Sequence, residues 1–147
     1  AAAPLSPKPI PVGHAISTPS QVAPHDFTAL VVDDDRRNIY ALTVLLERHG
    51  ITVLGVTGGR EAIATLQSTS GIDIVFMGIM MPLMDGYDTM RALRALPEFA
   101  DLPIIAVTAK AMKGDREKCI EAGAWDYLSK PVDTEQLLSV LRAWLLR

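Results

Sequence analysis

The chain has 147 residues, a formal net charge of −3 and 49% apolar residues. This length suits one domain of ordinary size, and the apolar content is typical of a globular protein. The acidic balance argues against a nucleic-acid-binding surface, which is usually basic. No apolar run approaches the roughly 20 residues of a membrane-spanning helix. We therefore expect neither a nucleic-acid partner nor a membrane span in this segment.

The first 26 residues differ in composition from the rest of the chain, because they hold six of its ten prolines. Proline fixes φ and removes a backbone donor, and no apolar periodicity accompanies these prolines. We expect residues 1–26 to form an extended, disordered linker and residues 27–147 to form the domain. A chain that starts at Ala1 with a linker is expected to be a piece of a longer protein.

The single cysteine, Cys119, has no partner for an internal disulfide. A chain without disulfides is typical of the cytoplasm, which is where we expect this one. Because Cys119 falls within a predicted helix, we interpret it as a structural thiol rather than a nucleophile.

From Phe27 onwards, short apolar runs alternate with stretches of helical spacing. The runs show little alternation between apolar and polar residues, as strands covered on both faces do. They are Ala29–Val32, Val53–Val56, Ile72–Met77, Ile104–Val107 and Tyr127–Leu128. This order predicts an α/β fold, a doubly wound parallel sheet of five strands with five helices on its faces.

The predicted helices carry recognisable end signals. Asp35 and Asp133 stand at N-cap positions, and Gln136 follows the second cap in the spacing of a capping box. Gly50 and Gly123 stand where helices should end.

Polar residues follow several of the predicted strands. Asp33, Asp34 and Asp35 follow the first, Thr108 the fourth, and Lys130 the fifth. Because parallel strands end at one edge of the sheet, where open α/β folds bind ligands, we expect two or three carboxylates, a hydroxyl and an ammonium to converge there. Adjacent carboxylates favour Mg2+, and the two donors suit a phosphoryl group. The set lacks a nucleophile.

Four separated motifs resemble the receiver domains of two-component response regulators, particularly the receivers of hybrid sensor histidine kinases. They are VVDDD at Val31–Asp35, MMPLMDGY at Met80–Tyr87, VTAKAMKGD at Val107–Asp115 and EAGAWDYLSKP at Glu121–Pro131. The resemblance implies a flavodoxin-like fold and a regulatory, non-enzymatic role. It also implies a histidine kinase or histidine phosphotransfer domain as partner, which donates a phosphoryl group to an aspartate with Mg2+.

The resemblance also implies roles for the residues after the strands. Asp33 and Asp34 correspond to the acidic pair that binds Mg2+, and the backbone carbonyl of Met80 corresponds to a further ligand. Gly78 stands where the family carries its phosphate-accepting aspartate, and no shift of register restores an acid. Glycine has no side chain to phosphorylate, so we expect a phosphorylation-deficient domain with weakened Mg2+ binding.

The remaining motif positions are intact. Thr108 corresponds to the switch hydroxyl and Tyr127 to the aromatic residue whose rotamer follows it. Lys130 corresponds to the lysine that contacts phosphate, and its bond to Pro131 is expected to be cis by resemblance, since most such bonds are trans.

Two explanations of Gly78 stay open. An aspartate-to-glycine change has disabled a receiver, or the chain is a natural pseudo-receiver that acts as a phosphate-independent protein-interaction module. The intact Thr108 and Lys130 favour the first. An unrelated flavodoxin-like enzyme or nucleotide binder is disfavoured, because a glycine-rich phosphate loop is missing. Trp125 stays open between packing on its own helix and serving a partner surface.

Overall fold

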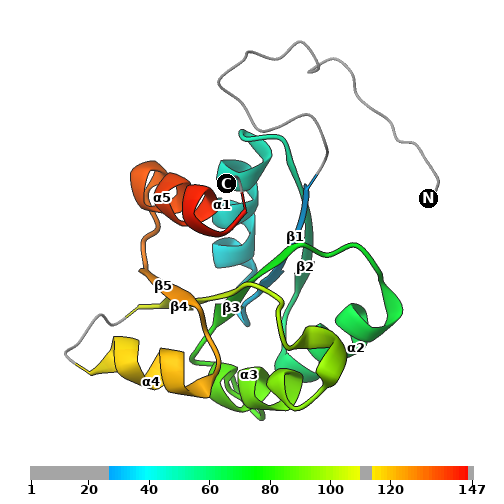
Figure 1. Ribbon diagram of the computed structural model, residues 1–147. Coiled ribbons are helices and arrows are strands. Elements are labelled where there is room, and N and C mark those ends of the chain that lie inside the picture. Colours follow the sequence, from blue (N-terminus) through cyan, green and yellow to red (C-terminus); the bar gives the residue numbers. More distant parts are fainter. Residues whose placement is uncertain (1–26, 110–113, 146–147) are drawn as a thin grey trace.

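The computed structural model describes residues 27–109 and 114–145 (Figure 1), so the expected linker lies outside the described residues. The strands are β1 (Phe27–Val32), β2 (Ile51–Val56), β3 (Ile74–Gly78), β4 (Ile104–Thr108) and β5 (Asp126–Ser129). The helices are α1 (Arg36–Glu47), α2 (Gly59–Ser68), α3 (Gly86–Arg94), α4 (Asp115–Ala122), α5 (Thr134–Trp144) and the short 3-10 helix η2 (Pro97–Phe99). All strand pairs are parallel, in the order β2-β1-β3-β4-β5. The predicted flavodoxin-like sheet is confirmed.

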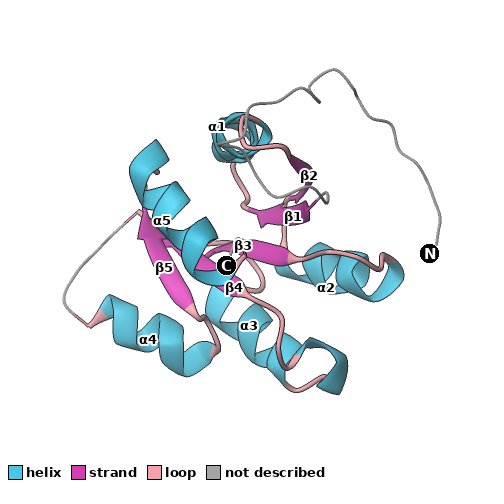
Figure 2. Ribbon diagram, turned by 45° about the horizontal axis from the view of Figure 1, so that its top comes forward, coloured by secondary structure: helices cyan, strands magenta, loops and turns pink. Residues whose placement is uncertain are grey.

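The sheet is covered on both faces (Figures 1 and 2). Helices α1 and α5 pack on one face, and α2, α3 and α4 pack on the other. Every residue of β3 and β4 is buried, which explains why the sequence of these strands shows no polar alternation. Among the described residues, no helix has the length and apolar character to span a membrane.

Strand β3 begins at Ile74, later than the predicted Ile72. Asp73 explains the difference, because its carboxylate accepts a hydrogen bond from the Thr28 N–H at 2.8 Å. The Asp73 N–H in turn donates to the Thr28 carbonyl at 2.8 Å. A side chain thus replaces one backbone acceptor of the ladder, and the regular strand starts after it.

The predicted helix ends are confirmed. Asp35 accepts a hydrogen bond from the Arg37 N–H at the start of α1, and Asp133 accepts one from the Gln136 N–H at the start of α5. Gly50 follows α1 with a φ of 79°, and Gly123 follows α4 with a φ of 125°. Such backbone conformations favour glycine because it has no Cβ.

Gly78 ends β3 in close contact with the end of β1. A Cβ at this position would lie 2.9 Å from the carbonyl oxygen of Val32 and 3.5 Å from Asp33 Oδ2. The first distance is shorter than real Cβ contacts, and its partner is backbone, so a side chain here requires the two strand ends to shift.

We expect the chain to be no less stable than its Gly78→Asp variant when divalent cations are chelated. The aspartate removes the entropic cost of glycine, about 0.5–1 kcal/mol. It also places a second carboxylate beside Asp33 and a Cβ against the Val32 carbonyl, and both raise the free energy of the folded state. Urea unfolding in EDTA measures the difference.

Gly78→Asn is the matched control, because it has nearly the same shape without the charge. We expect this variant to be more stable than the aspartate variant. The account would be contradicted by a clearly higher free energy of unfolding for Gly78→Asp than for the parent chain.

Candidate functional site

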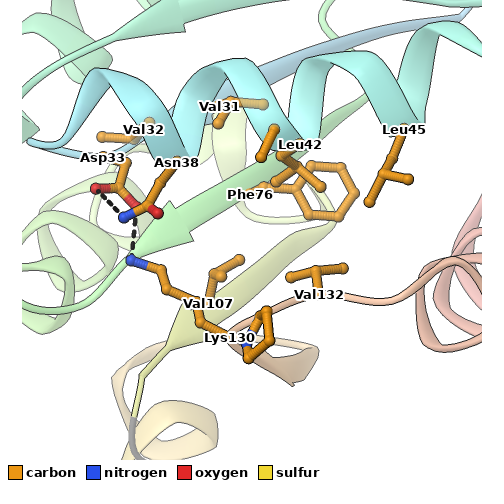
Figure 3. A pocket seen from close by; sticks show the side chains of 12 residues that line it. Val31, Val32, Asp33, Asn38, Leu42, Leu45, Phe76, Val107, Lys130 and Val132 are labelled. Carbon is orange, nitrogen blue, oxygen red and sulfur yellow. Dashed lines mark hydrogen bonds and ion pairs between the residues drawn. The ribbon is translucent and has the colours of Figure 1, made fainter.

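The carboxyl ends of the parallel strands lie at one edge of the sheet, which we call the site edge. Asp33 lies at this edge, directly after β1, and is only 4% exposed. Both of its carboxylate oxygens accept hydrogen bonds (Figure 3). Oδ1 accepts from the Asp35 N–H at 2.9 Å and from Asn38 Nδ2 at 3.3 Å. Oδ2 accepts from Lys130 Nζ at 2.7 Å. Because a buried carboxylate is costly unless its charge is paired, these donors explain how Asp33 is accommodated.

Lys130 follows β5 and reaches the end of β1, so its ion pair with Asp33 joins residues 97 positions apart. The two side chains are 25% and 6% exposed, which leaves the pair little screened by salt. The Lys130 N–H donates to the Thr108 carbonyl at 2.8 Å, which fixes the start of the loop. The Lys130–Pro131 bond is cis, as the resemblance implied.

The three consecutive aspartates lie in different surroundings. Asp33 is buried, whereas Asp34 is exposed to solvent. Asp35 caps α1, and its carboxylate accepts hydrogen bonds from the Arg37 guanidinium at 2.9 and 3.1 Å. These side-chain hydrogen bonds are the main cause of the lowered pKa of Asp35. Since Asp35 is committed to Arg37 and the helix, the carboxylates left for the site are Asp33 and Asp34.

The ends of β3 and β4 lie between β1 and β5. Gly78 pairs with Val107 in the parallel register, and Thr108 pairs with Ser129. Thr108 is 7% exposed and is one of the few buried polar residues in the described part of the chain. The structure therefore brings Gly78 and Thr108 to the same edge as the ion pair, as the sequence predicted.

Met80 and Tyr127, the other two residues predicted for the site, differ in their exposure to solvent. Met80 lies in the loop after β3 and is 75% exposed. Tyr127 lies within β5, is partly buried, and packs against the core beneath α2, α3 and α4.

The donor set at this edge suits a hard cation only in part. Within residues 27–109 and 114–145, no three His, Cys, Asp or Glu residues gather in a way that could hold a metal ion. Asp33 and Asp34 supply carboxylate oxygens, and Mg2+ commonly binds through one or two carboxylates while it keeps several waters. The residues present therefore fit Mg2+ held largely through water.

An apolar cavity of about 120 Å³ lies beside the ion pair, between α1 and the β5–α5 connection (Figure 3). Its lining is mostly aliphatic and aromatic and includes Leu42, Leu45, Phe76, Val107 and Val132. The polar end of the cavity is formed by Asp33, Asn38 and Lys130. Asn38 was not among the residues predicted for the site, although its place one turn into α1, near the aspartates, was a usable signal.

Trp125 lies just before β5, away from the site edge. Its ring centroid is 5.3 Å from that of Trp144 on α5, and the Arg94 guanidinium of α3 lies over it at 5.7 Å. The Trp125 N–H donates to the carbonyl of Ile104, the first residue of β4. Trp125 therefore lies in the connection between α4 and β5 and belongs to no helix, so the interpretation that it packs on its own helix is wrong, and its ring contacts α3 and α5 instead.

Comparison with known proteins agrees with this geometry. Residues 29–142 match the family described as the response regulator receiver domain. The chain is 39% identical over 116 residues to the protein PilH of Pseudomonas aeruginosa, covering 79% of this chain and 95% of PilH. It is 37% identical over 120 residues to hybrid signal transduction histidine kinase L of Dictyostelium discoideum, covering 78% of this chain but only 7% of the kinase.

A solved structure extends the comparison. The receiver domain of sensor histidine kinase PA1611 from Pseudomonas aeruginosa, with a magnesium ion coordinated in its active site cleft, has a TM-score of 0.74. Its sequence identity is 34%, and the match covers 82% of this chain and 98% of that one. By family match, fold and strand-end residues together, this chain belongs to the response regulator receiver domain family of two-component signalling, whose members are regulatory domains and not enzymes.

Proposed function

We propose that residues 27–147 form a phosphorylation-deficient receiver domain. It would keep the shape and partner contacts of a receiver and lack the covalent step that normally switches one. The observation that carries this proposal is Gly78, which stands at the end of β3 beside the Asp33–Lys130 ion pair. At this position the family pattern calls for an aspartate.

The missing step requires a nucleophile that this edge lacks. In a working receiver, an aspartate oxygen attacks the phosphorus of a phosphohistidine, the bond from phosphorus to the histidine nitrogen breaks, and an acyl phosphate forms. Gly78 supplies no oxygen for this attack. Asp33 is a poor substitute, because both of its oxygens already accept hydrogen bonds, one of them from Lys130.

The same proposal gives a role to each of the other site residues. The carboxylates of Asp33 and Asp34 and the carbonyl of Met80 would hold Mg2+. When bound, the cation would neutralise charge on phosphoryl oxygens.

On the same proposal, the Thr108 hydroxyl and the Lys130 ammonium would contact those oxygens, and Tyr127 would respond to Thr108. The burial of Thr108 at the end of β4 supports its role as a switch residue.

The proposed partner is a histidine kinase or a histidine phosphotransfer domain in the cytoplasm. The kinases among the relatives support this partner. The chain matches only 7% of hybrid kinase L, which is the share that one domain of a much larger kinase would have.

A natural pseudo-receiver is the second candidate. The close approach of the Val32 carbonyl to Gly78 favours it, because the strand ends fit glycine. The codon for residue 78 in the native gene separates the two candidates.

We expect that neither acetyl phosphate nor a cognate kinase phosphorylates any residue that follows β1 or β3, even in the presence of Mg2+. The reason is that residue 78 offers no carboxylate. Intact-mass spectrometry of the treated chain should show no species heavier by one phosphoryl group. A stable adduct that peptide mapping places among the residues following β1 or β3 would refute the proposal.

We expect Mg2+ to bind the Gly78→Asp variant about tenfold more tightly than the parent chain, since a third carboxylate is added to the ligands Asp33, Asp34 and the Met80 carbonyl. Isothermal titration calorimetry is the suitable method, because Trp125 and Trp144 contact each other away from the site edge and would report binding poorly. Gly78→Asn should show a smaller gain, because an amide carries no charge. Equal affinities for the parent chain and the aspartate variant would show that the missing carboxylate does not limit metal binding.

A further inference from the structure

We infer that Lys130 is a built-in counter-ion that closes the metal site of this chain. Its ammonium occupies Asp33 Oδ2, so a divalent cation must displace it in order to bind that oxygen. The inference rests on the proposed function, because it concerns the same site. It goes further by giving Lys130 a competing role in addition to the loss of a ligand at Gly78.

The geometry of the pair supports competition. Lys130 Nζ lies 2.7 Å from Asp33 Oδ2. Mg2+ binds oxygen at about 2.0–2.1 Å, so two cations on the same oxygen would lie only about 4 Å apart. At that distance, in a partly buried site, their repulsion is little screened. The other oxygen, Oδ1, already accepts hydrogen bonds from the Asp35 N–H and Asn38.

The charge balance of this chain makes the competition decisive. Asp33 is the one buried carboxylate among the described residues, and Lys130 neutralises it. With an aspartate at residue 78, one negative charge would remain after the lysine had paired, and a cation would still be attracted. With Gly78, the buried part of the site is neutral, and only the exposed Asp34 remains nearby.

The surroundings hold the lysine in place. Its backbone N–H is tied to the Thr108 carbonyl at 2.8 Å. Lys130 also lines the apolar cavity together with Val107 and Val132 (Figure 3). This apolar wall lowers the local dielectric constant and strengthens the attraction between the ammonium and Asp33.

Lys130→Met tests the inference, because methionine keeps an unbranched apolar side chain and removes the ammonium. Lys118→Met is the matched control, since it removes the same charge from an exposed position on α4. Calorimetric titration of each full chain with MgCl2 gives the affinities. We expect Lys130→Met to bind Mg2+ at least about tenfold more tightly than the parent chain, because Asp33 is left buried and unpaired. The control should change affinity by less than about twofold, as an exposed charge is well screened.

Two results would overturn the inference. Equal or weaker Mg2+ binding by Lys130→Met would mean that the lysine does not compete with the cation. An equal gain in both methionine variants would mean that overall charge, and not the pair with Asp33, sets the affinity.

The inference can be tested even if the Lys130→Met variant does not fold in the absence of metal. Mg2+ should then restore its thermal unfolding transition, because ligand binding to the folded state stabilises it. Failure of Mg2+ to restore folding would count against the inference.

The Gly78→Asp variant, titrated in parallel, separates this inference from the proposed function. A gain in the aspartate variant without a gain in Lys130→Met defeats the inference alone. No gain in either variant defeats the inference and also the proposal that the missing carboxylate weakens Mg2+ binding.

Discussion

The ion pair between Asp33 and Lys130 connects the first strand to the last across the edge of the sheet. The strand order places β3 and β4 between these two ends, so the pair spans the positions of Gly78 and Thr108. These ends lie together because all five strands are parallel, so that every carboxyl end lies at the same edge of the sheet. A buried carboxylate on β1 requires a cation, and the lysine after β5 provides it. Gly78 is thus bordered by a pair that is already neutral.

Much of this arrangement could be predicted from the sequence. Unbroken apolar runs, cap residues such as Asp35 and Asp133, and glycines after helices define the alternation of strands and helices. The residues that follow each predicted strand then indicate which side chains meet at the carboxyl edge of the sheet. The partner of Lys130 could not be predicted, because it depends on where the side chains lie at the ends of the four strands from β1 to β5. The contact between Trp125 and Trp144 depends in the same way on how α5 packs, and the late start of β3 depends on one carboxylate replacing a backbone acceptor.

If Gly78 stands in place of the phosphate-accepting aspartate, as we propose, the loss of that carboxylate has two separable consequences. A nucleophile is absent, which affects the covalent step. The charge balance at the edge also changes, which affects what binds there without a covalent bond. The core does not depend on either, since β3 is buried by apolar packing along its whole length and Gly78 fits closely against β1. On this proposal, the chain keeps the receiver fold and lacks only the covalent step.

An aspartate introduced at residue 78 tests the central claim most directly. The Gly78→Asp variant is treated with acetyl phosphate and Mg2+ beside the parent chain, and both are analysed by intact mass and peptide mapping. The account predicts a single Mg2+-dependent, hydroxylamine-sensitive phosphoryl group at residue 78 in the variant and none in the parent. It would be contradicted by a variant that stays unmodified although folded, or by equal labelling of the site edge in both chains.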